Sequence, residues 1–313
     1  MESLIFGPVP SRRLGKSIGI NSIPHKVCSY SCAYCQIGKA VKMQVERQKF
    51  YPVDILVREM EQKLNSLNAI DFPDYLSIVP DGEPTLDIHL GELILKLKTF
   101  HIPIAVIINS SLISNKSVQD ELMNADYLSV KVDTVDHNVW KRINKPHKDL
   151  NLDIILSAIQ DFSRIFDGKL VTESMLVKDM NDSDEELMQL GEYLKTIKPD
   201  KAYIAIPTRP VACKNIIPAD EAAVALAYEI FTCRCLSAEL LTGYEGNAFA
   251  SSGNFTEDIL SITAVHPMRK DAVLELMAKS NASSEVLNKL IDSKLIRKIS
   301  FNNQDFFVRC FGY

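Results

Sequence analysis

The sequence contains no apolar stretch long enough to cross a lipid bilayer. Uninterrupted apolar runs such as Ile104 to Ile108 are far shorter than the roughly 20 residues that a membrane-spanning helix needs. The acidic residue Glu2 and the proline Pro8 also depart from the pattern of a secretory signal peptide. A membrane protein is therefore not expected, and the predicted location is the cytoplasm.

An excess of positive charge is also absent. The 313 residues include 35 Lys and Arg against 40 Asp and Glu, which gives a net charge of −5. This balance predicts no general affinity for nucleic acid or an anionic membrane, so any such contact would need a local basic patch. Low-complexity tracts and internal repeats are absent too, and 46% hydrophobic residues are enough for a sizeable core. The length suggests about two domains.

Short β-branched runs alternate with helix-patterned stretches between residues 17 and 210. This order is typical of a parallel sheet with right-handed crossovers. The six predicted strands are 17–23, 75–80, 104–109, 127–133, 169–177 and 201–207. The predicted helices between them are 53–67, 90–100, 118–124, 151–166 and 184–197. Such units predict an α/β fold with an open or partial barrel, whose chemistry sits at the carboxyl ends of the strands.

The pattern changes after Pro210. An alanine-rich helix is predicted to open at residues 218–221 and to run through Cys233. Two amphipathic helices and two strand-like runs, 296–301 and 306–311, follow in the order of a winged-helix module. We therefore predict a core with its extension at 1–256 and a winged-helix-like module at 257–313. That module has 8 Lys and Arg against 7 Asp and Glu, so no clearly basic face is predicted.

The seven cysteines are unevenly placed. Three lie together in Cys28-Ser29-Tyr30-Ser31-Cys32-Ala33-Tyr34-Cys35, directly after the first predicted strand. Thiolates hold iron–sulfur clusters, and a [4Fe–4S] cluster with only three protein ligands keeps one iron open for a small molecule. A structural zinc site would use four ligands, and His25 could supply the fourth. Downstream, Cys213, Cys233 and Cys235 could hold an auxiliary cluster or could be free thiols.

The cysteine spacing resembles that of the radical S-adenosylmethionine (radical SAM) superfamily, and the resemblance extends over at least residues 9–210. It implies that Cys28, Cys32 and Cys35 bind a [4Fe–4S] cluster whose open iron is chelated by SAM. It also implies that Tyr34 packs near the adenine. The implied enzyme reductively cleaves SAM to a 5′-deoxyadenosyl radical, which abstracts hydrogen from a substrate. A one-electron reductant such as ferredoxin or flavodoxin is the implied partner.

A second matching element is Asp81-Gly82-Glu83-Pro84-Thr85, at the end of the second predicted strand. It resembles the Gly-Gly-Glu element of the superfamily, with Asp81 in place of the first glycine. A glycine in this loop lets the backbone approach the ligand closely, and Glu83 would face the ammonium group of SAM. The resemblance thus assigns Gly82 and Glu83 to the cofactor site.

Softer matches lie at the ends of later strands. The resemblance implies contacts with the ribose or methionine of SAM at Asn109, Lys131, Asp133 and Glu173. Alternatively, these polar side chains only cap loops. Beside the predicted cluster, the basic residues Arg12, Arg13 and Lys16 could bind an anionic group of the substrate or could form a solvated loop. Thr208 and Arg209 could also reach a substrate anion.

Residues 9–15 and 266–269 resemble a branch related to the wyosine-forming tRNA enzymes. Those enzymes hold a second cluster with cysteines placed before the main triplet, whereas this chain has no cysteine before Cys28. The favoured substrate is an RNA base, as in tRNA modification. The alternatives are a protein or peptide substrate, and a non-catalytic iron–sulfur sensor that binds DNA. No residue is assigned to the reaction on the substrate itself.

Overall fold

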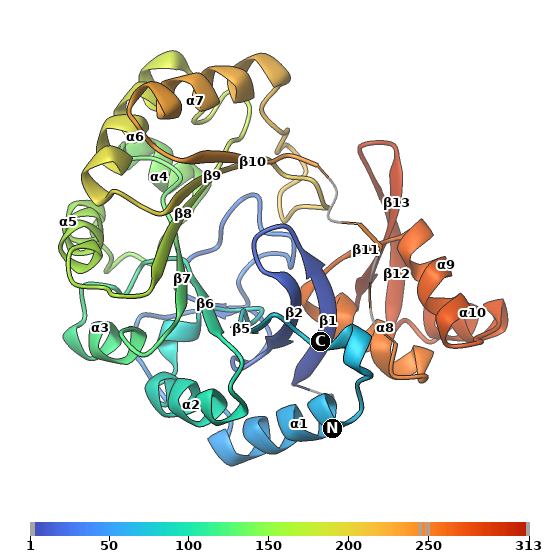
Figure 1. Ribbon diagram of the computed structural model, residues 1–313. Coiled ribbons are helices and arrows are strands. Elements are labelled where there is room, and N and C mark those ends of the chain that lie inside the picture. Colours follow the sequence, from blue (N-terminus) through green and yellow to red (C-terminus); the bar gives the residue numbers. More distant parts are fainter. Residues whose placement is uncertain (1–3, 244–245, 248, 250, 311–313) are drawn as a thin grey trace.

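A computed structural model describes residues 4–243, 246–247, 249 and 251–310. Its frame is an eight-stranded sheet that curls into a partial barrel, with helices on the outside (Figure 1). In spatial order the strands are β1 (Ile5–Ser11), β2 (Gly15–Ile20), β5 (Tyr75–Ile78), β6 (Ile104–Ile108), β7 (Tyr127–Lys131), β8 (Lys169–Met175), β9 (Lys201–Ala205) and β10 (Ala238–Leu241). Neighbours from β2 to β10 run parallel, and β1 runs antiparallel to β2. The predicted partial α/β barrel is confirmed.

Seven α-helices connect or follow these strands. They are α1 (Val53–Asn65), α2 (Leu90–Leu97), α3 (Lys116–Leu122), α4 (His137–Ile143), α5 (Leu152–Ser163), α6 (Asp184–Ile197) and α7 (Glu221–Cys233). Short 3-10 turns lie at Ala69–Asp71, Pro84–Leu86 and Lys98–Phe100. A two-stranded ribbon pairs β3 (Val27–Cys28) with β4 (Lys42–Met43). This ribbon leads into the cysteine loop.

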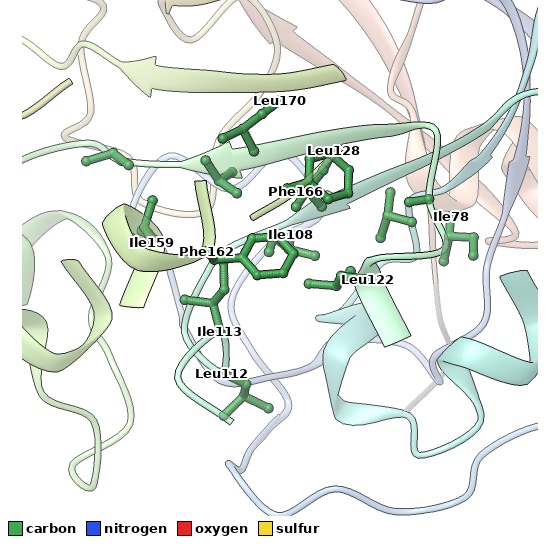
Figure 2. Packing of buried hydrophobic residues seen from close by; sticks show 14 of the residues in the cluster. Ile78, Ile108, Leu112, Ile113, Leu122, Leu128, Ile159, Phe162, Phe166 and Leu170 are labelled. Carbon is green, nitrogen blue, oxygen red and sulfur yellow. The ribbon is translucent and has the colours of Figure 1, made fainter. Parts of the chain in front are cut away.

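The core lies between the sheet and its outer helices, and Figure 2 shows part of it. Helix α5 illustrates why these segments fold as they do. Its apolar residues recur at helical spacing, so that Ile155, Ile159 and Phe162 are all buried on one face. The Asn151 side chain caps the helix by accepting a hydrogen bond from Ile154 N at 3.2 Å. Each fully buried side chain of this size contributes about 1.5–3 kcal/mol.

A smaller unit completes the chain. It consists of α8 (Phe255–Val265), β11 (Met268–Arg269), α9 (Lys270–Lys279), α10 (Ser284–Asp292), β12 (Ile296–Phe301) and β13 (Gln304–Arg309). The three strands form a separate sheet in the order β11-β13-β12. This is the winged-helix-like order of helices followed by a hairpin, and Figure 1 shows the unit beside β1 and β2.

The boundary predicted between residues 256 and 257 falls inside α8, which begins at Phe255. The apolar core of the small unit also includes Phe6 and Val9 from strand β1. The two predicted domains therefore share packing across their junction. Two residues used in the sequence predictions, Glu2 and Phe311, lie outside the described residues.

Two strands of the sheet have no counterpart among the six predicted strands. Strand β1 contains Pro8 and Pro10, which cannot donate backbone hydrogen bonds and so obscure a strand pattern; an edge position tolerates them. Strand β10, at the other edge, has only four residues. Helix α4 was also not predicted.

Candidate functional site

A cavity of about 270 Å³ opens at the carboxyl ends of the parallel strands. The cysteine loop forms one wall, and the residues that follow β5, β6 and β9 form others. Of the predicted metal and cofactor residues, all but Asp133 line it: Cys28, Cys32, Tyr34, Cys35, Gly82, Glu83, Asn109, Lys131 and Glu173. The fold therefore brings residues from distant parts of the sequence into one site, as expected for this edge of the sheet.

Each thiol of the cysteine loop faces a nitrogen donor. Asn109 Nδ2 lies 3.5 Å from Cys28 Sγ, and Asn144 Nδ2 lies 3.6 Å from Cys32 Sγ. Lys26 Nζ lies 3.1 Å from Cys35 Sγ. Hydrogen bonds to sulfur are one means by which proteins tune iron–sulfur clusters. Lys26 and Asn144 were not predicted from the sequence, because neither belongs to a recognisable motif.

Without a bound metal, two of these thiols resist deprotonation in this environment. Burial and, to a smaller extent, the nearby Glu83 carboxylate raise the pKa of Cys28 to about 12. Burial likewise raises the pKa of Cys32 to about 11. A bound metal deprotonates coordinating thiols outright. Three cysteines with a nitrogen donor for each sulfur therefore fit a site that holds thiolates around an iron–sulfur cluster.

His25, the alternative zinc ligand, has its Nδ1 2.6 Å from Asp81 Oδ2. Across the described part of the chain, no three His, Cys, Asp or Glu side chains are arranged to hold a single metal ion. Asp81 itself is buried, and its Oδ1 atom has no hydrogen-bond partner among the described residues. Asp81 also lines the cavity.

Glu83 is a buried carboxyl that is held in place by neighbouring donors. Its Oε1 accepts hydrogen bonds from Thr85 N at 3.1 Å and Thr85 Oγ1 at 2.6 Å. Its Oε2 accepts one from Asn109 N at 2.8 Å. Burial raises the pKa of Glu83 to about 7, although these hydrogen bonds lower it. A cation in the cavity would stabilise the ionised form.

Gly82 lines the cavity and also packs closely against the segment before the cysteine loop. A Cβ atom at this position would lie 2.1 Å from Val27 O and 2.7 Å from Ile23 Cγ2. The glycine therefore allows the loop that carries Glu83 to approach the strand that leads into the cysteine loop. A close approach between this backbone and a ligand stays a prediction.

Glu173 is paired with two cations. Lys131 Nζ donates to its Oε1 at 2.8 Å, and Arg13 donates to its Oε2. Burial alone would raise the pKa of Glu173, but Arg13 and Lys131 outweigh burial and lower it to about 2. The carboxylate is therefore ionised and keeps lone pairs for additional donors. Lys131 Nζ also lies 4.8 Å from the centroid of the Tyr34 ring.

Asp133 is buried behind the cavity. It accepts hydrogen bonds from the Tyr34 hydroxyl, from Asn144 Nδ2 at 2.6 Å and from Met175 N at 2.8 Å. These contacts fix the ring of Tyr34, which does line the cavity. The structure thus separates Asp133 from the residues that could touch a ligand directly.

The basic residues of the β1–β2 turn point in two directions. Arg12 and Arg13 line the cavity. Lys16 instead donates to the backbone oxygen of Ile70, and it does not belong to the cavity wall. The expectation that Lys16 lies beside the cluster loop was therefore wrong, because its backbone and side chain bind the segment before β5.

Thr208 and Arg209 also line the cavity, at the loop that follows β9. Arg209 Nη1 donates to Gln36 Oε1 at 3.0 Å, and Gln36 Nε2 donates to Val265 O at 3.2 Å. Gln36 directly follows Cys35. One side chain therefore connects the cysteine loop, the β9 loop and helix α8.

The three downstream cysteines do not come together. Cys213 N donates to Ala33 O at 3.1 Å, which places Cys213 beside the cysteine loop. Cys233 and Cys235 are exposed at the far end of α7. A helix of 13 residues spans about 20 Å at 1.5 Å per residue. An auxiliary cluster that uses all three is therefore not supported by their positions.

A curled parallel sheet whose carboxyl edge gathers cysteines and buried carboxylates is the architecture of a cofactor-dependent α/β enzyme. The family model described as the radical SAM superfamily matches residues 22–191, which include the cysteine loop and Glu83. The chain belongs to the radical SAM superfamily. Its members are enzymes that use a [4Fe–4S] cluster and SAM and that need an electron donor.

Relatives with known names extend the match over nearly the whole chain. A UPF0026 protein of Methanocaldococcus jannaschii is 42% identical over 309 residues, which cover 98% of this chain and 96% of the relative. A protein named GTPase Obg from Brachyspira hyodysenteriae is 31% identical over 94% of this chain and 43% of its own length.

Solved structures share the fold at low sequence identity. SuiB of Streptococcus suis is similar with a TM-score of 0.54 and 16% identity, over 71% of this chain and 48% of SuiB. TYW1 with a lysine-pyruvate adduct gives the same TM-score of 0.54 and 16% identity, over 70% of this chain and 74% of TYW1. Among the described residues, no helix is both long and apolar enough to cross a membrane.

Proposed function

We propose that Cys28, Cys32 and Cys35 hold the [4Fe–4S] cluster and that Glu83 binds the ammonium group of SAM. The observation that carries this proposal is the convergence of three thiols, each facing a nitrogen donor, with a buried carboxyl on the wall of one cavity. When bound, the cluster and SAM supply reductive cleavage of SAM and abstraction of hydrogen from the substrate.

The remaining cavity residues bind and orient. Glu173 is ionised and keeps lone pairs, so it accepts hydrogen bonds from the ribose hydroxyls of SAM. Lys131 holds Glu173 and faces the Tyr34 ring, which packs near the adenine. Asn109 bridges the cysteine loop and Glu83, because its side chain contacts Cys28 Sγ and its backbone donates to Glu83. Asp133 is a positioning residue that acts through Tyr34.

The metal assignment is tested by removing one thiol. Protein reconstituted without oxygen should bind four irons and four sulfides and absorb broadly in the visible range, as expected of a cubane. Cys32→Ala should lose this absorption because two thiolates do not anchor such a cluster. Cys233→Ala, an exposed cysteine, is the matched control and should keep it. Stoichiometric zinc without iron in the anaerobic protein would contradict the proposal.

The substrate that we propose is an RNA base. Support comes from the resemblance of residues 9–15 and 266–269 to the wyosine-related branch and from the cations Arg12 and Arg209 on the cavity wall. The sensor alternative is not retained, because the superfamily consists of enzymes.

Mass spectrometry of RNA nucleosides from a deletion strain tests this substrate class. One modified nucleoside should be absent and should return on complementation with the wild-type gene but not with the Cys32→Ala gene. An unchanged nucleoside profile would contradict an RNA substrate and would favour a protein or peptide, the second substrate class.

A further inference from the structure

A second cavity, of about 350 Å³, lies at the junction between the barrel and the small C-terminal unit. We call it the junction cavity. Its wall combines residues 36–38, which directly follow the cysteine loop, with parts of the loop after β9, of helix α8 and of the β12–β13 hairpin. Gln36 and Ile37 line both the junction cavity and the cavity that contains Glu83. The two cavities are therefore neighbours, and one extended ligand can reach both.

The junction cavity has a basic wall. Among the described residues that line it, none is Asp or Glu, whereas Arg297, Arg309 and His25 are present. Arg309 Nη1 donates to Leu295 O at 2.9 Å, and His25 Nδ1 lies 2.6 Å from Asp81 Oδ2, so both side chains are held by neighbours. Arg297 is exposed, and no carboxylate in the described ranges forms an ion pair with it. Arg297 is therefore the cation of this wall that can meet an anionic ligand.

The acidic residue of the hairpin does not neutralise Arg297. Asp305 pairs with Lys298, whose Nζ lies 2.7 Å from Asp305 Oδ2. The strand register places Asp305 opposite Ser300, and alternate residues of a strand share a face. Asp305 and Lys298 therefore lie on one face of the hairpin, and Arg297 lies on the other.

Much of the remaining wall is apolar. Arg297 is opposite Val308 in the hairpin, so Val308 and Ile299 share its face of the sheet. Ile37 and Val211 add apolar side chains from the segments after the cysteine loop and after β9. A ligand that matches this wall combines a negative charge with an apolar group. A nucleotide has both, because it joins a phosphate to a base whose faces pack on apolar side chains.

We propose that the junction cavity binds the nucleotide next to the reactive one in the RNA substrate, with the Arg297 guanidinium on its phosphate. The inference rests on the proposed RNA substrate, and it states where the flanking nucleotide lies. Enzymes that act on a base take it out of the stack and select its context partly through contacts with the flanking nucleotides. The reactive base enters the cavity that contains Glu83, and the strand continues past Gln36 and Ile37 to the hairpin. The small C-terminal unit thereby selects the surroundings of the base.

A nucleotide fits the junction cavity better than an acidic peptide does. An Asp or Glu side chain would bring a charge to Arg297 but would leave the apolar wall uncovered, whereas a nucleotide covers both. Arginines also occur along the whole path, since Arg209 lines the cavity that contains Glu83 and Arg297 lines its neighbour. Guanidinium groups bind phosphate in a bidentate manner. A strand whose charge repeats at every nucleotide matches this succession of arginines.

Charge reversal at Arg297 tests the proposal. The matched control is Lys289→Glu, which makes the same charge change at an exposed position on α10 that does not line the junction cavity. The probe is a fluorescein-labelled single-stranded RNA of mixed sequence. Binding to the full chain is measured by fluorescence anisotropy before cluster loading, so the result does not depend on the proposed cluster ligands.

Arg297→Glu should bind the RNA about tenfold or more weakly at low salt, because it loses a hydrogen bond to a charged group. The salt dependence of its Kd should fall by about one phosphate contact. Arg297→Lys keeps the charge and should keep that salt dependence, and Lys289→Glu should bind nearly as the wild type does. Equal Kd values for Arg297→Glu and Lys289→Glu would overturn the proposal.

Photo-crosslinking locates the bound strand separately from any change in affinity. RNA that contains 4-thiouridine should attach to wild-type peptides that include Ile37 or Ile299, which line the junction cavity. The same peptides should be labelled much less in Arg297→Glu. Labelling confined to other parts of the chain would also contradict a nucleotide site in this cavity.

The remaining outcomes separate this site from the proposed substrate. RNA binding that Arg297→Glu leaves intact would overturn the junction-cavity site and leave the RNA substrate standing. Failure of the wild-type protein to bind RNA even at low salt would contradict the RNA substrate and this site together. If Arg297→Glu loses binding of a polyglutamate peptide but keeps RNA binding, the cavity belongs to an acidic peptide and the proposal is wrong.

Discussion

The most consequential titratable residue in the cavity is Glu83. Burial holds its pKa at about 7, above the value of an ordinary glutamate. The proton-bound form of the carboxyl is therefore favoured in the folded protein until the pH rises through about 7. Only the ionised form pairs with an ammonium group, so under the proposed function SAM and protons compete for the same carboxyl.

Glu83→Gln should keep the cluster and bind SAM about tenfold or more weakly, because a hydrogen bond to a charged group contributes about 1.5–3 kcal/mol. In the wild-type protein, SAM affinity should rise as the pH increases from 6 to 7.5, because ionised Glu83 becomes more abundant. That part of the pH dependence should be missing from Glu83→Gln. Calorimetry across this range measures both effects, and equal pH profiles would show that Glu83 does not contact the ammonium.

Gly82 allows a prediction about stability, because other atoms already occupy the space that a side chain would need at this position. In Gly82→Ala the new Cβ atom would lie 2.1 Å from Val27 O, a backbone atom that cannot move aside cheaply. We expect a loss of about 2–4 kcal/mol and weaker cluster retention. Gly243→Ala is the control, because no heavy atom of the described residues lies within 4 Å of the corresponding Cβ position. Thermal unfolding of both variants before cluster loading separates the steric effect from metal binding; similar Tm values would contradict the account.

At the residue scale, the sequence predicts the parts of the site that belong to motifs. The three cysteines and Glu83 could be found because their spacing resembles a family pattern. Asn144 and Lys26 could not be found, because their donor roles arise from how α4 and the β3–β4 ribbon pack against the loop. Asp133 was found as a polar residue at a strand end, but its burial behind Tyr34 depends on side-chain packing.

Among the elements, the β1–β2 hairpin can be tested separately, because some of its cations line the cavity and another does not. Arg13 pairs with Glu173 across the cavity, whereas Lys16 contacts Ile70 on the outside. Arg13→Ala should lower SAM affinity several-fold and decrease Tm, because it removes one of the two cations that donate hydrogen bonds to the buried Glu173; loss of such a charged partner costs about 1–3 kcal/mol. Lys16→Ala should change SAM affinity little. Titration of both variants with SAM checks the contrast, and equal affinities would remove Arg13 from the site.

Element prediction succeeds where one periodic pattern runs the length of the element. Helix α6 matches its predicted bounds, since Ser183 caps it and Leu187, Leu190 and Leu194 recur at helical spacing. The hairpin strand β12 also has its predicted bounds. Strand β1 fails this test because its place is set by pairing with β2, and its prolines hide that pairing in the sequence.

At the scale of the whole molecule, the central question is whether the small C-terminal unit is needed by the barrel. All proposed ligands of the cluster and of SAM lie before residue 174. A chain that ends at residue 253 should therefore still assemble the cluster and cleave SAM slowly with dithionite. It should unfold at a lower temperature, because Phe6 and Val9 lose the core that covers them. Iron content and thermal unfolding measure the two effects.

Failure of the shortened chain to assemble a cluster would show that the C-terminal unit belongs to the folding unit of the barrel. The matched comparison is Val265→Ala in the full chain, which weakens the shared core but keeps the backbone oxygen that Gln36 contacts. Loss of the cluster in the shortened chain alone would assign the defect to the missing unit and not to small changes in packing.

The shared core also has a consequence for the order in which the protein is made. Phe6 and Val9 leave the ribosome well before α8, which covers them and begins 249 residues after Phe6. At a synthesis rate of about 5–20 residues per second, that interval lasts roughly 12–50 s. During this time the barrel can form behind its first strand, but the apolar outer side of that strand stays uncovered. A chaperone that binds apolar segments would therefore have a long opportunity to bind at strand β1.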